Sequence, residues 1–152
     1  MMLTELLAAS RITANTSISS KKKALEHLAG LLAEDSDALD AIEVFDALAA
    51  REKLGSTGFG DGIAIPHARV PHCMSPRCAL VTLAPAIDFD AIDRQHVDIL
   101  WALIVPEQAT DEHLAILAAV AELLGNDANR QAIRAARTGE QLLELVAQTQ
   151  AS

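Results

Sequence analysis

Aromatic side chains are scarce in this chain of 152 residues, which has three Phe, one Trp and no Tyr. Proteins that bind single-stranded nucleic acid stack bases on aromatic rings and use Lys and Arg to neutralise the phosphates. Here 12 Lys and Arg stand against 21 Asp and Glu, and the net charge is −9. This balance argues against nucleic acid as a partner and favours basic proteins or small molecules.

Long apolar runs and cysteines are also lacking. The longest apolar runs, 99–106 and 114–124, are too short to cross about 30 Å of hydrocarbon. Glu5 stands where a signal peptide would carry positive charge. Cys73 and Cys78 are too few for a disulfide framework, so we expect free thiols. The sequence therefore predicts no membrane insertion and a cytoplasmic location.

Apolar residues make up 51% of the chain, and their spacing predicts a single α/β domain with a mixed sheet and helices outside. We expect helices over 21–33, 37–54, 112–124, 127–137 and 138–148, and strands over 11–16, 63–65, 78–83 and 97–105. Pro85 and Pro106 should end the last two strands, and 68–76 should be a loop. Helical spacing places Ile42 and Leu114 on buried faces.

Four of the seven glycines, Gly55, Gly58, Gly60 and Gly62, lie within eight residues. Backbone N–H groups in such a loop can approach an anion that side chains would otherwise hold away. The spacing matches neither a Walker A loop nor the Rossmann fingerprint. An anion site and a tight structural turn both remain open.

Three side chains near this loop could supply chemistry. His67 follows an apolar strand, at the end where α/β proteins hold ligands, although a structural histidine is the alternative. His113 lies in a first helical turn, which favours a neutral ring that donates to an anion; otherwise it is simply exposed. Arg51 precedes the loop and could bind phosphate, or could pair with Glu52 or Asp46 on the surface.

Other site types fit the sequence less well. A zinc site built from His67, His72, Cys73 and Cys78 would lack a C-x-x-C pair. A serine hydrolase would need a G-x-S-x-G motif, which is missing. Lys21 and the two lysines after it begin a helix, and we interpret them as a solvated face.

Residues 51–67, which run from Arg51 through the glycine loop to Ile65-Pro66-His67, closely resemble the active-site segment of a known family. This family is the fructose and mannitol class of phosphotransferase-system enzyme IIA proteins, and the nitrogen-regulatory branch fits best. Residues 20–26, 89–95 and 97–106 also resemble that branch, so the similarity covers nearly the whole chain.

The resemblance implies one enzyme IIA domain over 1–152, with a mixed sheet of about five strands flanked by helices on both sides. His67 would be phosphorylated, and His113 and Arg51 match residues that hold the phosphoryl group. The loop would cradle the oxygens through Ser56, Thr57 and its four glycines. No metal or other cofactor is implied.

The implied donor is a histidine-containing phosphocarrier protein. The implied output is regulatory, with potassium-transport or sensor-kinase proteins bound according to phosphorylation state. Two alternatives remain: a sugar-specific enzyme IIA that passes phosphate to a IIB domain, and a binding module without transfer.

The sequence departs from the family pattern at two places. Ala68 and Arg69 stand where Gly and Lys are common, and Asp61 stands where Asn is often found. Asp61 either weakens phosphorylation by its charge or merely faces solvent.

Overall fold

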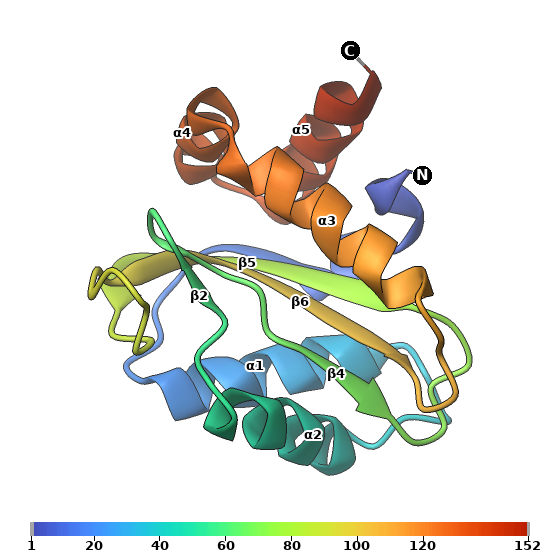
Figure 1. Cartoon of the computed structure of the whole chain (residues 1–152). Coiled ribbons are helices and arrows are strands. Elements are labelled where there is room, and N and C mark those ends of the chain that lie inside the picture. The colour runs from blue at the N-terminus through green and yellow to red at the C-terminus, as the bar shows by residue number, and fades with distance from the viewer. Residues whose placement is uncertain (1, 152) are drawn as a thin grey trace.

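The computed structural model describes residues 2–151, and a mixed β-sheet lies between two layers of helices (Figure 1). One layer packs on the sheet through a cluster that includes Leu28 and Leu48, and the other through a cluster that includes Val120 and Leu142. The first layer comprises α1 (Lys21–Glu34) and α2 (Ala41–Lys53); the second comprises α3 (Glu112–Gly125), α4 (Asp127–Ala135) and α5 (Gly139–Ala151). The predicted α/β class, with helices on both sides, is confirmed.

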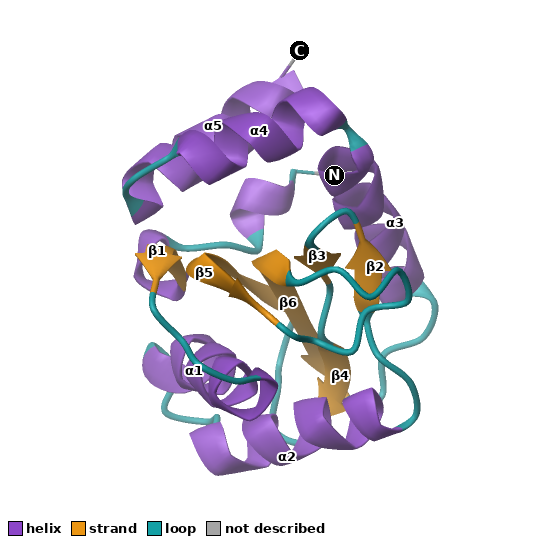
Figure 2. Ribbon diagram, turned by 90° about the vertical axis from the view of Figure 1, so that its left-hand side faces the viewer, coloured by secondary structure: helices purple, strands orange, loops and turns teal. Residues whose placement is uncertain are grey.

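The sheet has six strands, one more than the resemblance implied. They are β1 (Ile12–Thr16), β2 (Gly58–Gly60), β3 (Ile63–Ala64), β4 (His67–Val70), β5 (Arg77–Ile87) and β6 (Val97–Pro106). The order is β1-β5-β6-β3-β2, and β4 also pairs with β6, beyond the end of β3 (Figure 2). β6 is antiparallel to β5 but parallel to β3 and β4, so it joins the two parts of the sheet.

Two predictions about strands were wrong. Residues 68–70 belong to β4, because Ala68 and Arg69 lie in register with Ile104 and Val105 of β6. β5 also continues beyond Pro85 to Ile87. The register with β6 is interrupted between Thr82 and Ile87, so proline occupies a stretch where no ladder N–H is required. Pro106 does end β6, as predicted.

Two helical faces were also assigned wrongly. Ile42 is 69% exposed and Leu114 is 55% exposed. α2 instead buries Val44, Leu48 and Glu52, whereas α3 buries Ile116, Val120, Leu123 and Leu124. Both helices carry apolar side chains on several sides, so periodicity alone did not identify the face that meets the sheet.

Helix ends follow local sequence more closely. Ser20 accepts a hydrogen bond from the backbone N–H of Lys23 and caps α1. Thr138 accepts one from the N–H of Gln141, at the start of α5. Both cysteines are free thiols, on opposite faces of the sheet. Within residues 2–151, no helix has both the length and the apolar character needed to cross a membrane.

Candidate active site

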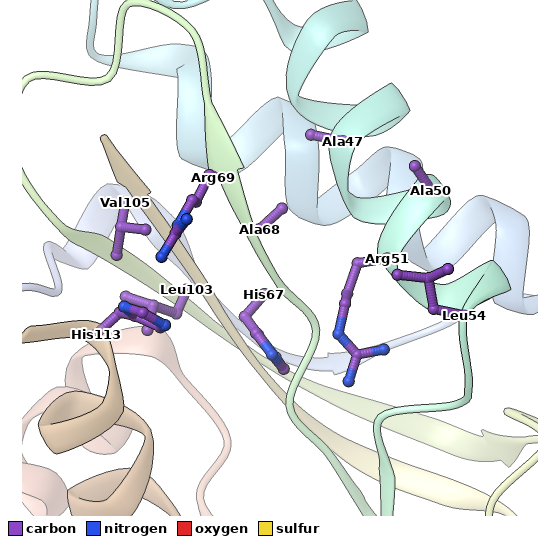
Figure 3. Close-up of a pocket in the computed structure, with 10 residues that line it drawn as sticks. All are labelled: Ala47, Ala50, Arg51, Leu54, His67, Ala68, Arg69, Leu103, Val105 and His113. Atoms are coloured by element: carbon purple, nitrogen blue, oxygen red, sulfur yellow. The ribbon is translucent and has the colours of Figure 1, made fainter. Parts of the chain in front are cut away.

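A cavity of about 550 Å³ lies between α2, β4 and the start of α3 (Figure 3). Its size is in the range typical of small-ligand sites. It brings together Arg51 from α2, His67 and Arg69 from β4, and His113 from α3. The other lining residues are small or apolar: Ala47, Ala50, Leu54, Ala68, Leu103 and Val105. Three of the predicted site residues therefore face one cavity.

The ring of His67 is oriented by the chain just before it. Its Nδ1 lies 2.8 Å from the carbonyl oxygen of Ile65, which can only accept a hydrogen bond. The proton of the neutral ring is therefore on Nδ1, and Nε2 carries the free lone pair. The backbone between β3 and β4 is anchored to the sheet, because the carbonyl oxygen of Pro66 accepts the N–H of Leu103 in β6. The backbone thus holds the neutral ring of His67 with Nε2 unprotonated.

The electrostatic surroundings keep this ring neutral. Burial lowers the pKa of His67 below its ordinary value of 6.5, against the opposing effect of the Ile65 carbonyl. The positive charge of Arg51 lowers the pKa further, Glu52 raises it, and His113 lowers it. Because burial dominates, the unprotonated ring predominates at neutral pH, as a nucleophile requires.

Two guanidinium groups face the cavity without a carboxylate. Arg51 donates from Nη1 to the carbonyl oxygen of Gly55 at 2.9 Å, and Arg69 points toward the same space (Figure 3). Within residues 2–151, neither forms a salt bridge, and no Asp or Glu lines the cavity. The surface pairing of Arg51 with Glu52 or Asp46 is therefore not what the structure shows. The site favours an anion, although the whole chain carries −9.

His113 lies at the first turn of α3, and its Nδ1 is 2.6 Å from the carbonyl oxygen of Thr110. A carbonyl requires a donor, so this bond occupies the only proton of a neutral ring. Nε2 of neutral His113 is then an acceptor. A neutral ring in this arrangement has no second N–H to give to an anion, and the predicted donor role of neutral His113 stays a prediction.

The glycine loop lies outside the cavity lining. The hydroxyl of Ser56 donates to the carbonyl oxygen of Phe89 and accepts from the N–H of Gly58. Thr57 donates its N–H and its hydroxyl to the carboxylate of Glu52. Both hydroxyls bind the loop to the protein around it. The role of Ser56 and Thr57 in holding phosphate stays a prediction.

Gly58 and Gly62 have packing reasons of their own. A Cβ on Gly58 would come within 2.7 Å of Ala91, and one on Gly62 within 2.5 Å of the guanidinium of Arg134. Gly62 also has a φ of +81°. Gly55 and Gly60 likewise have positive φ, and none of the four glycines lines the cavity. These features favour the tight-turn interpretation of the loop.

The two departures from the family pattern lie in different places. Ala68 and Arg69, which form the first, line the cavity. Asp61 lies at the turn between β2 and β3, where its carboxylate is 4.0 Å from Arg130 of α4. Its charge is directed to that arginine and to solvent. Over the part of the chain that the structure describes, no three His, Cys, Asp or Glu side chains gather as metal ligands.

Sequence reasoning missed Glu52 and misjudged Lys21. The side chain of Glu52 is only 4% exposed, and the ammonium of Lys21 lies 3.0 Å from its Oε1. Lys21 also lies 3.6 Å from Asp90 and 4.7 Å from the ring centroid of Phe89, so it is not part of a solvated face. The i, i+4 spacing of Val44, Leu48 and Glu52 was the available signal, since it places Glu52 on the buried side.

Comparison with known proteins gives one consistent result. Residues 5–149 match the sequence model of a family described as the phosphoenolpyruvate-dependent sugar phosphotransferase system, EIIA 2. A nitrogen regulatory protein of Pseudomonas aeruginosa is 45% identical over 148 residues, covering 97% of this chain and 96% of that protein.

Two solved structures share the fold. The nitrogen regulatory protein IIA-Ntr from Neisseria meningitidis has a TM-score of 0.89 at 35% identity, covering 96% of this chain and 99% of that one. Enzyme IIAMTL of Escherichia coli, solved in complex with phosphorylated enzyme IIBMTL, has a TM-score of 0.77 at 17% identity, covering 94% and 99%. The second likeness shows the fold alone. The chain therefore belongs to the EIIA 2 family of the phosphoenolpyruvate-dependent sugar phosphotransferase system, and within it is similar to the nitrogen regulatory proteins.

Proposed function

We propose that Nε2 of His67 accepts a phosphoryl group from a histidine-containing phosphocarrier protein, and that the phosphorylation state of His67 determines which regulatory partner is bound. The observation that carries this proposal is the orientation of His67. Its Nδ1 is engaged by the Ile65 carbonyl, while the ring lines a cavity to which residues 2–151 contribute two guanidinium groups and no carboxylate. Family membership supplies the class of chemistry, which is phosphoryl transfer.

The transfer step balances without a metal ion or an external base. The lone pair of Nε2 forms a bond to phosphorus as the phosphorus–nitrogen bond of the donor breaks and its electron pair returns to the donor ring. Nδ1 of His67 keeps its proton, so the phosphorylated ring carries a positive charge. The carbonyl oxygen of Ile65, 2.8 Å away, stabilises that charge as it develops.

The phosphoryl oxygens carry the opposing charge. In this proposal Arg51 and Arg69 bind them from two sides of the cavity, which His113 also lines. Catalysis then consists of positioning and charge stabilisation, as phosphoryl transfer generally requires of a protein. The acidic net charge favours encounter with a basic donor surface.

The regulatory output rests on the relatives named nitrogen regulatory protein. Potassium-transport and sensor-kinase proteins are the proposed targets. The second candidate, onward transfer to a IIB domain, is favoured by the shared fold with IIAMTL, whose solved complex contains phosphorylated IIBMTL. The two candidates differ in where the phosphoryl group goes.

The experiment combines the purified protein with enzyme I, a histidine phosphocarrier and labelled phosphoenolpyruvate. Intact mass should show the addition of one phosphate, which acid treatment removes because N–P bonds are acid-labile. His67→Ala should show no addition, and His113→Ala should show slower addition.

A IIB domain added to the phosphorylated protein separates the two outputs. Rapid loss of label to IIB would establish the sugar-type role, whereas retained label with a changed set of bound proteins would establish the regulatory one. Phosphate on His67→Ala at the wild-type rate would overturn the assignment of the nucleophile. If no carrier phosphorylates the wild type, the chain is a binding module without transfer.

A further inference from the structure

Glu52 is a buried carboxylate beside the cavity that does not line it. It follows Arg51 at the end of α2, and the two side chains point to different places. Arg51 reaches the carbonyl oxygen of Gly55, and Glu52 accepts the N–H of Thr57 at 3.1 Å and also its hydroxyl. The segment between α2 and β2 is therefore held from both sides by consecutive residues of one helix.

A continuous series of hydrogen bonds leads from Glu52 to the ring of His67. Glu52 binds Thr57, and the carbonyl oxygen of Thr57 accepts the N–H of Ile65 at 3.1 Å. The carbonyl oxygen of Ile65 in turn accepts Nδ1–H of His67 at 2.8 Å. Every step is a short contact between residues that are at least partly buried. Displacement of Thr57 would therefore move Ile65 and, with it, the acceptor that orients the imidazole.

Lys21 makes a carboxylate tolerable at this place. A buried Glu52 without a partner would be costly and would oppose an incoming phosphoryl group. The ammonium of Lys21 lies 3.0 Å from Glu52 and only 20% of its side chain is exposed, so the pair neutralises itself. The positive charges of Arg51 and Arg69 then remain free for the cavity.

We propose that Glu52, neutralised by Lys21, is a positioning residue for phosphoryl transfer, which acts through Thr57 and Ile65 to hold the His67 ring with Nε2 free. This rests on the proposed function of His67. Glu52 touches neither donor nor phosphoryl group. Its effect should therefore appear in the rate at saturating donor and in the state of the His67 ring, and not in donor affinity.

The first test is Glu52→Gln, which keeps the shape and removes the charge. We expect a loss of about tenfold in the rate at saturating donor, because small displacements of a nucleophile slow transfer strongly. KM for the donor protein should stay near the wild-type value. NMR of the imidazole nitrogens should show a smaller fraction of the Nδ1–H tautomer. The pKa of His67 should also fall, because Glu52 raises it.

The matched control is Glu43→Gln, the same change on the same helix at an exposed residue. It should leave the transfer rate, the tautomer and the His67 titration at wild-type values. Wild-type rate and unchanged nitrogen shifts in Glu52→Gln would overturn the proposal. An equal loss in Glu43→Gln would also overturn it, since it would reveal a general effect of charge.

Thr57 provides a second, milder pair of variants in case Glu52→Gln does not fold. Thr57→Val removes the hydroxyl that Glu52 accepts, and Thr57→Ser retains it. Thr57→Val should slow transfer and shift the His67 tautomer in the direction seen for Glu52→Gln, and Thr57→Ser should restore both. A slower rate in Thr57→Val with an unchanged tautomer would show instead that this hydroxyl acts on the phosphoryl group, and would overturn the proposal.

These measurements separate the two levels of inference. If the wild-type protein accepts no phosphate on His67, the proposed function fails. The imidazole nitrogen shifts of wild type and Glu52→Gln are measured without any donor, so they still decide whether Glu52 orients His67.

Discussion

Arginines occur at two ends of the sheet, in opposite situations. At the turn between β2 and β3, Arg134 donates from Nε to both carboxylate oxygens of Asp98, at 3.0 and 2.9 Å, and Arg130 contacts Asp127. At the far end of β3 and β4, Arg51 and Arg69 face a cavity in whose lining the described residues include no acid. Paired arginines dock α4 on the sheet, whereas arginines left unpaired keep their charge available for an anion.

One histidine lies in each of these two regions, and the charges around the two rings differ. His67 has its Nδ1 fixed by backbone and is surrounded by positive charge. His96 lines a cleft with three acids, Asp61, Asp98 and Asp127, and with Arg130 and Arg134, whose charges are engaged by those acids. The residue types alone do not distinguish the sites; the balance of charge in the lining does.

Removing an unpaired arginine gives the largest expected effect. Arg51→Ala should lower the rate of His67 phosphorylation by about 100-fold, because it deletes a charged donor to the phosphoryl oxygens. The free energy of unfolding should fall by no more than about 1 kcal/mol, since within residues 2–151 Arg51 makes no ion pair and the bond it loses, to the carbonyl oxygen of Gly55, is exposed. Labelled phosphocarrier measures the rate of phosphorylation, and urea unfolding measures the free energy of unfolding. A wild-type rate of phosphorylation in Arg51→Ala would contradict the role proposed for the unpaired arginines.

Removing a paired arginine should instead lower the stability of the protein and leave the rate of phosphorylation nearly unchanged. Arg134→Met breaks the bonds to Asp98 and to the Asp61 carbonyl, and should lower the free energy of unfolding by about 1–2 kcal/mol. The variant that remains folded should accept phosphate within about twofold of the wild-type rate, since additivity holds for distant sites. Urea unfolding measures the loss. A large drop in the phosphorylation rate of Arg134→Met, with unchanged stability, would contradict the structural role of this arginine.

The titration of His67 tests how burial and the charge of Arg51 act on its ring. Burial lowers its pKa, so NMR should place the midpoint below 6.5. Because the neutral ring is the nucleophile in the proposed mechanism, acceptance of phosphate should decline as the pH falls through that lower midpoint. Arg51→Ala should move the midpoint upward, because Arg51 lowers the pKa while Glu52 and His113 remain. A midpoint above 6.5 in wild type would contradict the burial argument.

The smallest effect is expected at Asp61. Asp61→Asn restores the residue often found in the family, yet the side chain faces Arg130 and not the cavity. Phosphorylation should proceed at the wild-type rate, and the melting temperature should hardly change because Asn accepts the φ of +58°. Intact mass against time is the measurement. Faster phosphorylation of Asp61→Asn would show that its charge does reach His67.

Much of this architecture is predictable because it is local. Apolar spacing identified the helices and β6, and polar residues such as Ser20 and Thr138 marked helix starts, since capping involves neighbours in the chain. The association of His67 with Arg51 and His113 came from the family resemblance, and the structure places all three around one cavity.

What the sequence could not supply depends on contacts between distant segments. Residues 68–70 form a strand only because β6 lies beside them, and Leu114 is exposed because α3 turns another face to the sheet. The hydroxyls of Ser56 and Thr57 were expected to bind phosphate. In the structure they donate hydrogen bonds to Phe89 and to Glu52. No periodicity in the sequence encodes these partners.

The sequence by itself determined the family, the class of fold and the candidate nucleophile, because motif spacing and apolar periodicity are properties of the chain. Only the tertiary structure decided which charges remain unpaired and which nitrogen of each histidine is free. Those outcomes depend on which acid or carbonyl packs against each side chain: Ile65 against His67, Thr110 against His113, and Glu52 against Lys21. The carbonyls that bind the two histidines are near them in sequence, but packing decides which way each ring turns, and it also brings Lys21 and Glu52 together from different helices.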